Sequence, residues 1–141
     1  MNLVKRYPLV SLMLLGLIIR LIISPLDYSF DVNNHIAWAK DLWNRGFINF
    51  YGLPSTEVYA SLYPNYPPFA MYIFYSVYPL FIAINKLTWW LNVSFSYFPS
   101  QLVFFVQSRV FEAMILKLPA IIADLLLARI VYIFAKKIAS W

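Results

Sequence analysis

Two long apolar runs, one near each end of the sequence, limit what this chain can fold into more than any other feature. The first, YPLVSLMLLGLIIRLIISPL, covers residues 7–26, and the second covers residues 109–137. About 20 apolar residues are enough for a helix to cross the hydrocarbon core of a bilayer. Only 12% of the residues are charged, against roughly 25% in an average soluble domain. The sequence therefore predicts an all-α integral membrane protein.

Basic residues at the outer ends of the two runs indicate their orientation. Lys5 and Arg6 precede the first run, and Lys136 and Lys137 follow the second. Because cytoplasmic segments are enriched in lysine and arginine, both termini are expected in the cytoplasm. Three crossings that start inside would place the last two lysines outside. We therefore expect two transmembrane helices flanking an outer loop, with three transmembrane helices as the alternative, in the plasma membrane of a prokaryote.

A cleaved signal peptide is the competing interpretation of the first run. The run is long, Arg20 interrupts it, and the sequence IISPLDYS lacks the small-x-small pattern of a cleavage site. An uncleaved signal anchor is therefore expected. Arg20 falls in the outer part of this helix, where its side chain either extends to the interface or contacts an anion. The first of these two roles is favoured.

The outer loop, residues 27–108, contains two stretches with helical spacing. In residues 32–46 the apolar side chains follow steps of four, three and four, and Gly46 is expected to end the helix. In residues 67–86 tyrosines occupy one side of the helix and other apolar residues the opposite side. Both stretches are predicted to be amphipathic juxtamembrane helices at the outer interface. Residues 88–108 carry no charge and are expected to form an interfacial or buried loop.

Asp31 stands at the start of the first of these helices. An aspartate in this position can cap the helix by accepting backbone N–H bonds of the first turn. Ser29 could cap the helix instead, which would leave the Asp31 carboxylate free. Asp31, His35 and Trp38 also share one strip of the helix. That strip is either a reaction centre or the edge of an interfacial helix.

Two charged residues of the last run, Lys117 and Asp124, lie on one helical stripe with three alanines. Small residues allow helices to approach closely, and charged residues inside a membrane face protein or water rather than lipid. The stripe is therefore expected to contact protein, either further transmembrane helices of the same chain or partner subunits. Lys117 and Asp124 are predicted to be structural polar residues within the membrane.

Composition excludes several kinds of function. The chain has no cysteine and one histidine, which argues against a disulfide framework, thiolate chemistry and an all-protein zinc site. The net charge is +5, but the basic residues are scattered, and their two adjacent pairs flank apolar runs. No nucleic-acid partner is expected, because the basic pairs have the placement of membrane topology signals.

Three segments of the chain resemble the GT-C superfamily of membrane glycosyltransferases, and in particular its protein-mannosyltransferase-like (family 39-like) branch. They are FDVNNHIAWAKDLWNRGFINFYG, YPNYPPFAMYIFY and LKLPAIIADLLLARIVYIFAKK. The resemblance extends over most of the chain from Phe30 onward. Members of this family have many membrane spans, so the resemblance implies that residues 1–141 are the N-terminal membrane module of a larger enzyme, a hexosyltransferase.

The resemblance also implies a reaction and the residues that perform it. A sugar would move, with inversion, from a polyprenyl-phosphate-linked donor to an acceptor at the outer membrane face. Asp31 matches the family's aspartate in the first outer loop and would be the catalytic base, a task that one carboxylate can perform. Positive groups can stabilise the departing phosphate and aromatic rings can stack on sugars. The candidate substrate-binding residues are Arg20, His35, Arg45, Tyr63 and Tyr66.

One departure from the family pattern concerns a second acidic residue. Related sequences often have Asp-Tyr-Pro-Pro-Gly where this chain has Asn65 followed by Tyr-Pro-Pro-Phe. No cofactor is expected, and the missing acid leaves the need for a divalent metal open. The alternative to an enzyme is a non-catalytic membrane scaffold or a small subunit of a membrane complex. A transporter is disfavoured, because the polar residues gather in the outer loop rather than at the membrane midplane.

Overall fold

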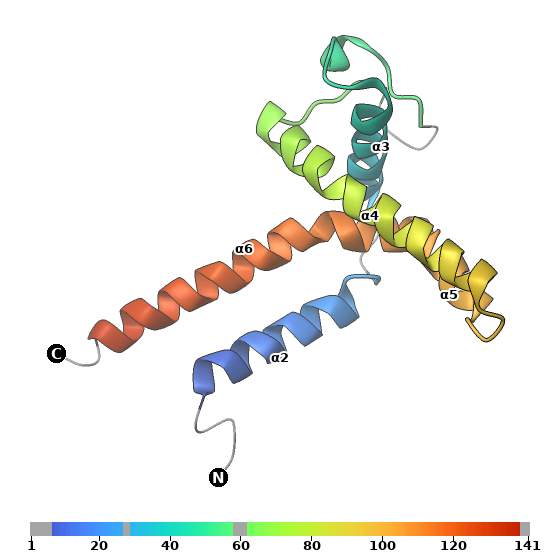
Figure 1. Ribbon diagram of the computed structural model, residues 1–141. Coiled ribbons are helices and arrows are strands. Elements are labelled where there is room, and N and C mark those ends of the chain that lie inside the picture. Colours follow the sequence, from blue (N-terminus) through green and yellow to red (C-terminus); the bar gives the residue numbers. More distant parts are fainter. Residues whose placement is uncertain (1–6, 27–28, 58–61, 139–141) are drawn as a thin grey trace. The chain divides into compact units, whose positions relative to one another are not determined.

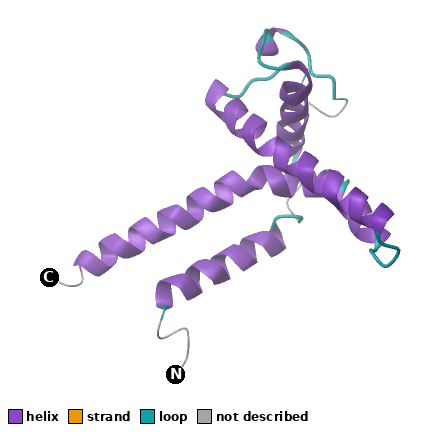
Figure 2. Cartoon of the chain, viewed as in Figure 1, coloured by secondary structure: helices purple, strands orange, loops and turns teal. Residues whose placement is uncertain are grey.

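The computed structural model describes residues 7–26, 29–57 and 62–138 (Figure 1). Within these ranges all regular structure is helical and no strand occurs (Figure 2). The helices are α2 (Pro8–Ile23), α3 (Phe30–Arg45), the short 3₁₀ helix η1 (Phe50–Gly52), α4 (Pro68–Ser94), α5 (Ser100–Val106) and α6 (Arg109–Ile138). The prediction of an all-α protein is confirmed for the described residues.

Helix lengths only partly follow the expected pattern of spans. α4, with 27 residues, and α6, with 30, are long and apolar enough to cross a membrane. α2 has 16 residues and is therefore about 24 Å long, which is shorter than the roughly 30 Å hydrocarbon core. By length and composition alone, the two candidate spans are thus α4 and α6, and the first apolar run is too short to count as a third.

The prediction of a loop over residues 88–108 is wrong. α4 begins close to the expected residue 67 but continues past residue 86 to Ser94, and α5 occupies a further part of the expected loop. The physical reason is that neither glycine nor proline follows Leu87 until Pro99. No glycine or proline therefore interrupts the helix between Leu87 and its end at Ser94.

The chain divides into two compact units. The first contains α2 and α6 from Lys117 onward, and the second contains the described residues from Ser29 to Leu116. α6 therefore contributes its first two turns to the second unit and the rest of its length to the first.

In the first unit, α2 and α6 run antiparallel and are joined by polar side chains. Lys117 Nζ donates to the Ser24 carbonyl at 2.8 Å. Further along both helices, Arg20 Nε and Nη2 donate to Asp124 Oδ2, each at 3.3 Å. Because residue numbers fall along α2 as they rise along α6, the start of α2 and the end of α6 lie at the same end of this unit. Lys117 and Asp124 thus both have partners within the chain.

The rest of this unit exposes apolar side chains. Leu12 and Ile22 of α2 and Leu127 and Phe134 of α6 are all about three-fifths exposed. A soluble protein rarely exposes so much contiguous apolar surface, whereas lipid tails cover such a surface readily.

The second unit is built around α3. Gly46 ends the helix with a φ of 73°, a left-handed conformation that glycine adopts without strain. Trp38 and Leu42 of α3 form a core with Phe50 and Met71. Eight of the sixteen residues of α3 are buried, including Asn33, Asn34 and Asp41. α3 is therefore enclosed by protein on most sides and does not present one free polar face, as an amphipathic interfacial helix would.

We predict that Asp124→Leu lowers the melting temperature of the purified protein in detergent by more than Leu126→Ala does. Removing the carboxylate leaves Arg20 without its partner, whereas Leu126 is half-exposed and makes no polar contact. The double variant Arg20→Leu/Asp124→Leu should recover most of the loss. A double variant as unstable as Asp124→Leu alone would show that the ion pair is not the cause.

Candidate functional site

Asp31 lies in the first turn of α3 but does not cap it. The Ser29 hydroxyl accepts the Val32 N–H at 3.3 Å and serves as the cap. Asp31 is exposed, and its carboxylate makes no hydrogen bond or ion pair within the described ranges. The carboxylate is therefore available to a ligand.

His35, one turn after Asp31, packs into a group of rings that we name the aromatic cluster: His35, Trp38, Tyr66 and Phe74. The imidazole stacks on Phe74 with ring centroids 4.6 Å apart and meets Tyr66 edge-on at 4.6 Å. The ring centroid of Trp38 lies 5.9 Å from that of His35 and 5.6 Å from that of Tyr66. His35 Nε2 and Trp38 Nε1 are both buried and have no hydrogen-bond partner among the described residues. Such unpaired buried groups are uncommon in native proteins.

The electrostatic setting of His35 keeps the ring neutral. Burial lowers the pKa of His35 below its usual value, and the nearby Asp31 carboxylate opposes this shift to a smaller extent. At neutral pH the imidazole therefore has one nitrogen that donates and one that accepts a hydrogen bond. Asp31 and His35 are thus electrostatically coupled, although they make no direct hydrogen bond.

The other candidate substrate-binding residues are in different positions. The Tyr66 carbonyl accepts the Tyr51 hydroxyl at 2.8 Å, which holds the segment before α4. Arg45 Nη2 lies 3.2 Å from Asp41 Oδ2, and Arg45 Nη1 donates to the Pro54 carbonyl. Tyr63 is half-exposed. Of this set, His35 and Tyr66 are in contact.

Arg20 belongs to the first unit, where it is engaged with other groups. Besides its contact with Asp124, its Nη1 donates to the Gly16 carbonyl at 3.3 Å. The guanidinium is therefore paired with a carboxylate of its own unit. A substrate phosphate would have to compete with Asp124 for it.

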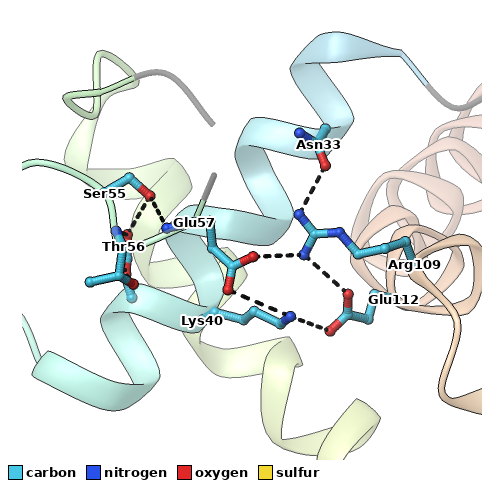
Figure 3. Close-up of polar contacts among 8 residues, drawn as sticks. Asn33, Lys40, Ser55, Thr56, Glu57, Arg109 and Glu112 are labelled. Atoms are coloured by element: carbon cyan, nitrogen blue, oxygen red, sulfur yellow. Dashed lines mark hydrogen bonds and ion pairs between the residues drawn. The ribbon is translucent and has the colours of Figure 1, made fainter. Parts of the chain in front are cut away.

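Four charged side chains that sequence reasoning overlooked form what we call the ion-pair ring (Figure 3). They are Lys40, Glu57, Arg109 and Glu112. Lys40 Nζ lies 3.6 Å from Glu57 and 3.3 Å from Glu112, and Arg109 Nη1 lies 3.3 Å from Glu57 and 3.4 Å from Glu112. Arg109 Nη2 also donates to Asn33 Oδ1 at 2.9 Å. The ring joins α3, the segment around Glu57 and the first turn of α6.

Asp41 is a second overlooked residue, and it is fully buried. Its carboxylate accepts the Ser55 hydroxyl at 2.7 Å, the Thr56 N–H at 3.3 Å and the Thr56 hydroxyl. Arg45 balances its charge. Asp41 therefore fastens the segment after η1 to α3, which is a structural task.

No group of three or more histidine, aspartate and glutamate side chains in the described part of the chain is arranged to hold a metal ion. Comparisons of the chain with protein-family models, curated protein sequences and solved structures found no match. Its function is therefore inferred from its own residues.

We predict that Asp41→Ala lowers the free energy of unfolding by about 1–3 kcal/mol, because the Ser55 and Thr56 donors lose their buried acceptor. The matched control is Asn44→Ala on the same helix, whose side chain is exposed and should change stability by no more than about 0.5 kcal/mol. Denaturant unfolding in detergent measures both. Equal stability of the two variants would contradict the structural role of Asp41.

A second prediction concerns pH. Since burial lowers the pKa of His35 in the folded state, the unfolded chain binds more protons between that pKa and about 6.5. The contribution of His35 to stability is therefore complete above pH ~6.5 and is lost as the pH falls toward the folded-state pKa.

The coupling between Asp31 and His35 gives this prediction a sharper form. Asp31→Asn removes the carboxylate that raises the pKa of His35, so that pKa should fall further. His35 is the only histidine in the chain, and its NMR titration can be followed without ambiguity. An unchanged pKa in the Asp31→Asn variant would show that the two side chains do not interact.

Proposed function

We propose that this chain forms part of the active site of a GT-C-type membrane glycosyltransferase, with Asp31 as the catalytic base. One observation carries the proposal. The chain has six acidic residues, and Asp27 lies outside the described ones. Asp41, Glu57, Glu112 and Asp124 each pair with a cation, whereas Asp31 makes neither an ion pair nor a hydrogen bond with another described residue.

The proposed reaction needs one base and an activated donor. The Asp31 carboxylate takes the proton of the acceptor hydroxyl while the oxygen of that hydroxyl attacks the anomeric carbon of the donor sugar. The bond between that carbon and the phosphate oxygen breaks, and the polyprenyl phosphate leaves with the electron pair. Attack from the face opposite the leaving group inverts the anomeric carbon.

The aromatic cluster provides groups suited to the sugar. Within the described residues, the buried His35 Nε2 and Trp38 Nε1 have no partner, and a sugar hydroxyl that reached them would pair with these nitrogens through hydrogen bonds. Tyr66 lies in the same cluster and Tyr63 precedes it in the chain. Arg20 and Arg45 would bind the donor phosphate only by exchanging their present carboxylate partners for it.

We further infer that the protein resides in a membrane with both termini in the cytoplasm. Support comes from the exposed apolar side chains of α2 and α6 and from the antiparallel arrangement of these helices. Lys136 and Lys137 lie in the last turn of α6, and positive residues favour the cytoplasmic side. Lys5 and Arg6, the matching signal, lie outside the described residues. Membrane lipid and further transmembrane helices would cover the remaining apolar surface.

A non-catalytic scaffold or subunit is the second candidate, and a specific observation favours it. The ion-pair ring and Asp41 use most of the described charges of the second unit in structural contacts. A scaffold would need these contacts and would not need Asp31.

Substitution of Asp31 distinguishes the two candidates. Asp31→Asn and Asp31→Ala should each lower sugar transfer at least ~10²-fold, because neither side chain can act as a general base. Both variants should fold, since Ser29 retains the helix cap. The measurement is transfer of labelled sugar from a polyprenyl-phosphate donor in membranes of cells that express the intact gene, together with the melting temperature.

Ser29→Ala is the matched control. It removes the cap and should lower stability by about 0.5–2 kcal/mol while leaving the base in place. Near-wild-type transfer by Asp31→Asn would exclude Asp31 from the chemistry and support the scaffold.

A further inference from the structure

The last part of α4 and the whole of α5 form a helical hairpin, residues 82–106, which we name the aromatic hairpin. α5 packs against α4 (Figure 1). At the tip, Asn92 Nδ2 donates to the Phe98 carbonyl and to Ser100 Oγ, both at 3.1 Å, and these bonds fasten the turn. At the base, the ring centroid of Phe111 in α6 lies 6.3 Å from that of Phe81 in α4 and 5.5 Å from that of Phe105 in α5.

These contacts show that the hairpin returns to the level at which it starts. Phe81 lies near the middle of α4, and the residues from 82 to the end of α4 extend about 20 Å beyond it. The chain then turns, and by Phe105 and Phe111 it has come back to Phe81. A hairpin of this depth does not span a hydrocarbon core of roughly 30 Å. Both of its ends therefore lie on one side of a membrane, although α4 alone is long enough to cross.

The surface of the hairpin has the chemistry of the bilayer interface. No charged residue occurs from Leu87 to Ser108. Five aromatic side chains, Trp89, Trp90, Phe95, Tyr97 and Phe104, are more than half exposed, with exposed fractions from 54% to 98%. Tryptophan and tyrosine are enriched where a membrane meets water, and the two helices satisfy most of their own backbone hydrogen bonds, as a lipid environment requires.

The distribution of this exposure distinguishes lipid from a protein partner. Trp89 and Trp90 are consecutive residues and therefore point about 100° apart around α4, yet they are 56% and 57% exposed. Tyr97 at the tip is 98% exposed. A docked protein would cover one face of the hairpin, whereas lipid surrounds it on all sides that face away from the rest of the second unit.

We propose that the aromatic hairpin enters the outer leaflet of the bilayer, contacts lipid with these rings and returns to the side from which it came. α4 is then not a crossing, which excludes the alternative with three crossings. The proposal depends on the hairpin geometry and on its uncharged surface, and it is independent of the sugar-transfer chemistry.

Site-directed spin labelling in reconstituted vesicles tests the proposal, and the chain has no native cysteine to interfere. A nitroxide is attached at Tyr97→Cys on the tip, and at Ile48→Cys as the aqueous control, because Ile48 is 89% exposed in the segment after α3. The label at position 97 should collide more often with oxygen, which enters lipid, than with a polar nickel complex. The label at position 48 should show the reverse preference.

Three results would overturn the proposal. Access of the nickel complex to position 97 only from the side opposite position 48 would mean that α4 crosses the membrane. Equal access from the same side as position 48 would mean that the tip lies in water. Exclusion of both oxygen and nickel would mean that protein covers the tip. Because the side chain of Tyr97 is almost fully exposed, its replacement should not prevent folding.

Discussion

The buried carboxylate of Glu112 is the constraint on which the second unit depends. It is only 4% exposed, and an uncompensated charge in such a place would be strongly destabilising. Lys40 of α3 and Arg109 of α6 neutralise it, and Glu57 balances the second positive charge. The four charges can be satisfied together only when the first turn of α6 and the segment around Glu57 both lie against α3.

Fixing α3 in this way decides what its two ends can do. Toward its C-terminal end, Asp41 and Arg45 fasten the segment after η1. At its N-terminal end, Ser29 takes the capping role, and the Asp31 carboxylate makes no hydrogen bond or ion pair with another described residue. The helix that bears the proposed base is thus held by contacts that do not use it. A base positioned in this manner can be replaced without unfolding its surroundings, as a substitution test of its chemistry requires.

Local patterns in the sequence were sufficient to predict most helices but not what surrounds them. The apolar runs and the helical spacing after Asp31 located α2, α3 and α6, and Gly46 located the end of α3. The ion-pair ring could not be predicted, because Lys40, Glu57 and Glu112 are far apart in the sequence and only Arg109 and Glu112 are helical neighbours.

The same limitation explains the two errors about surroundings. The polar residues of α3 suggested a face in water, but Asn33, Asn34 and Asp41 are buried by other parts of the unit. Aromatic, uncharged residues after Leu87 suggested a loop, although no glycine or proline occurs among them before Pro99. The sequence could not decide alternatives that depend on a single contact. Whether Ser29 or Asp31 caps α3 was decided by the hydrogen bond from the Val32 N–H to the Ser29 hydroxyl.

The contact between Lys117 and Ser24 adds a topological argument to these local ones. The chain leaves α2 just after Ser24 and returns to the helix pair at Lys117. It therefore departs from and rejoins the pair at the same end, the end opposite Lys136 and Lys137. In the proposed two-crossing topology, the segment between the two helices begins and finishes on one side of the bilayer, as the proposed aromatic hairpin does. Under that proposal, a lipid-linked phosphate, confined to the headgroup region, would be held at the surface that the hairpin enters.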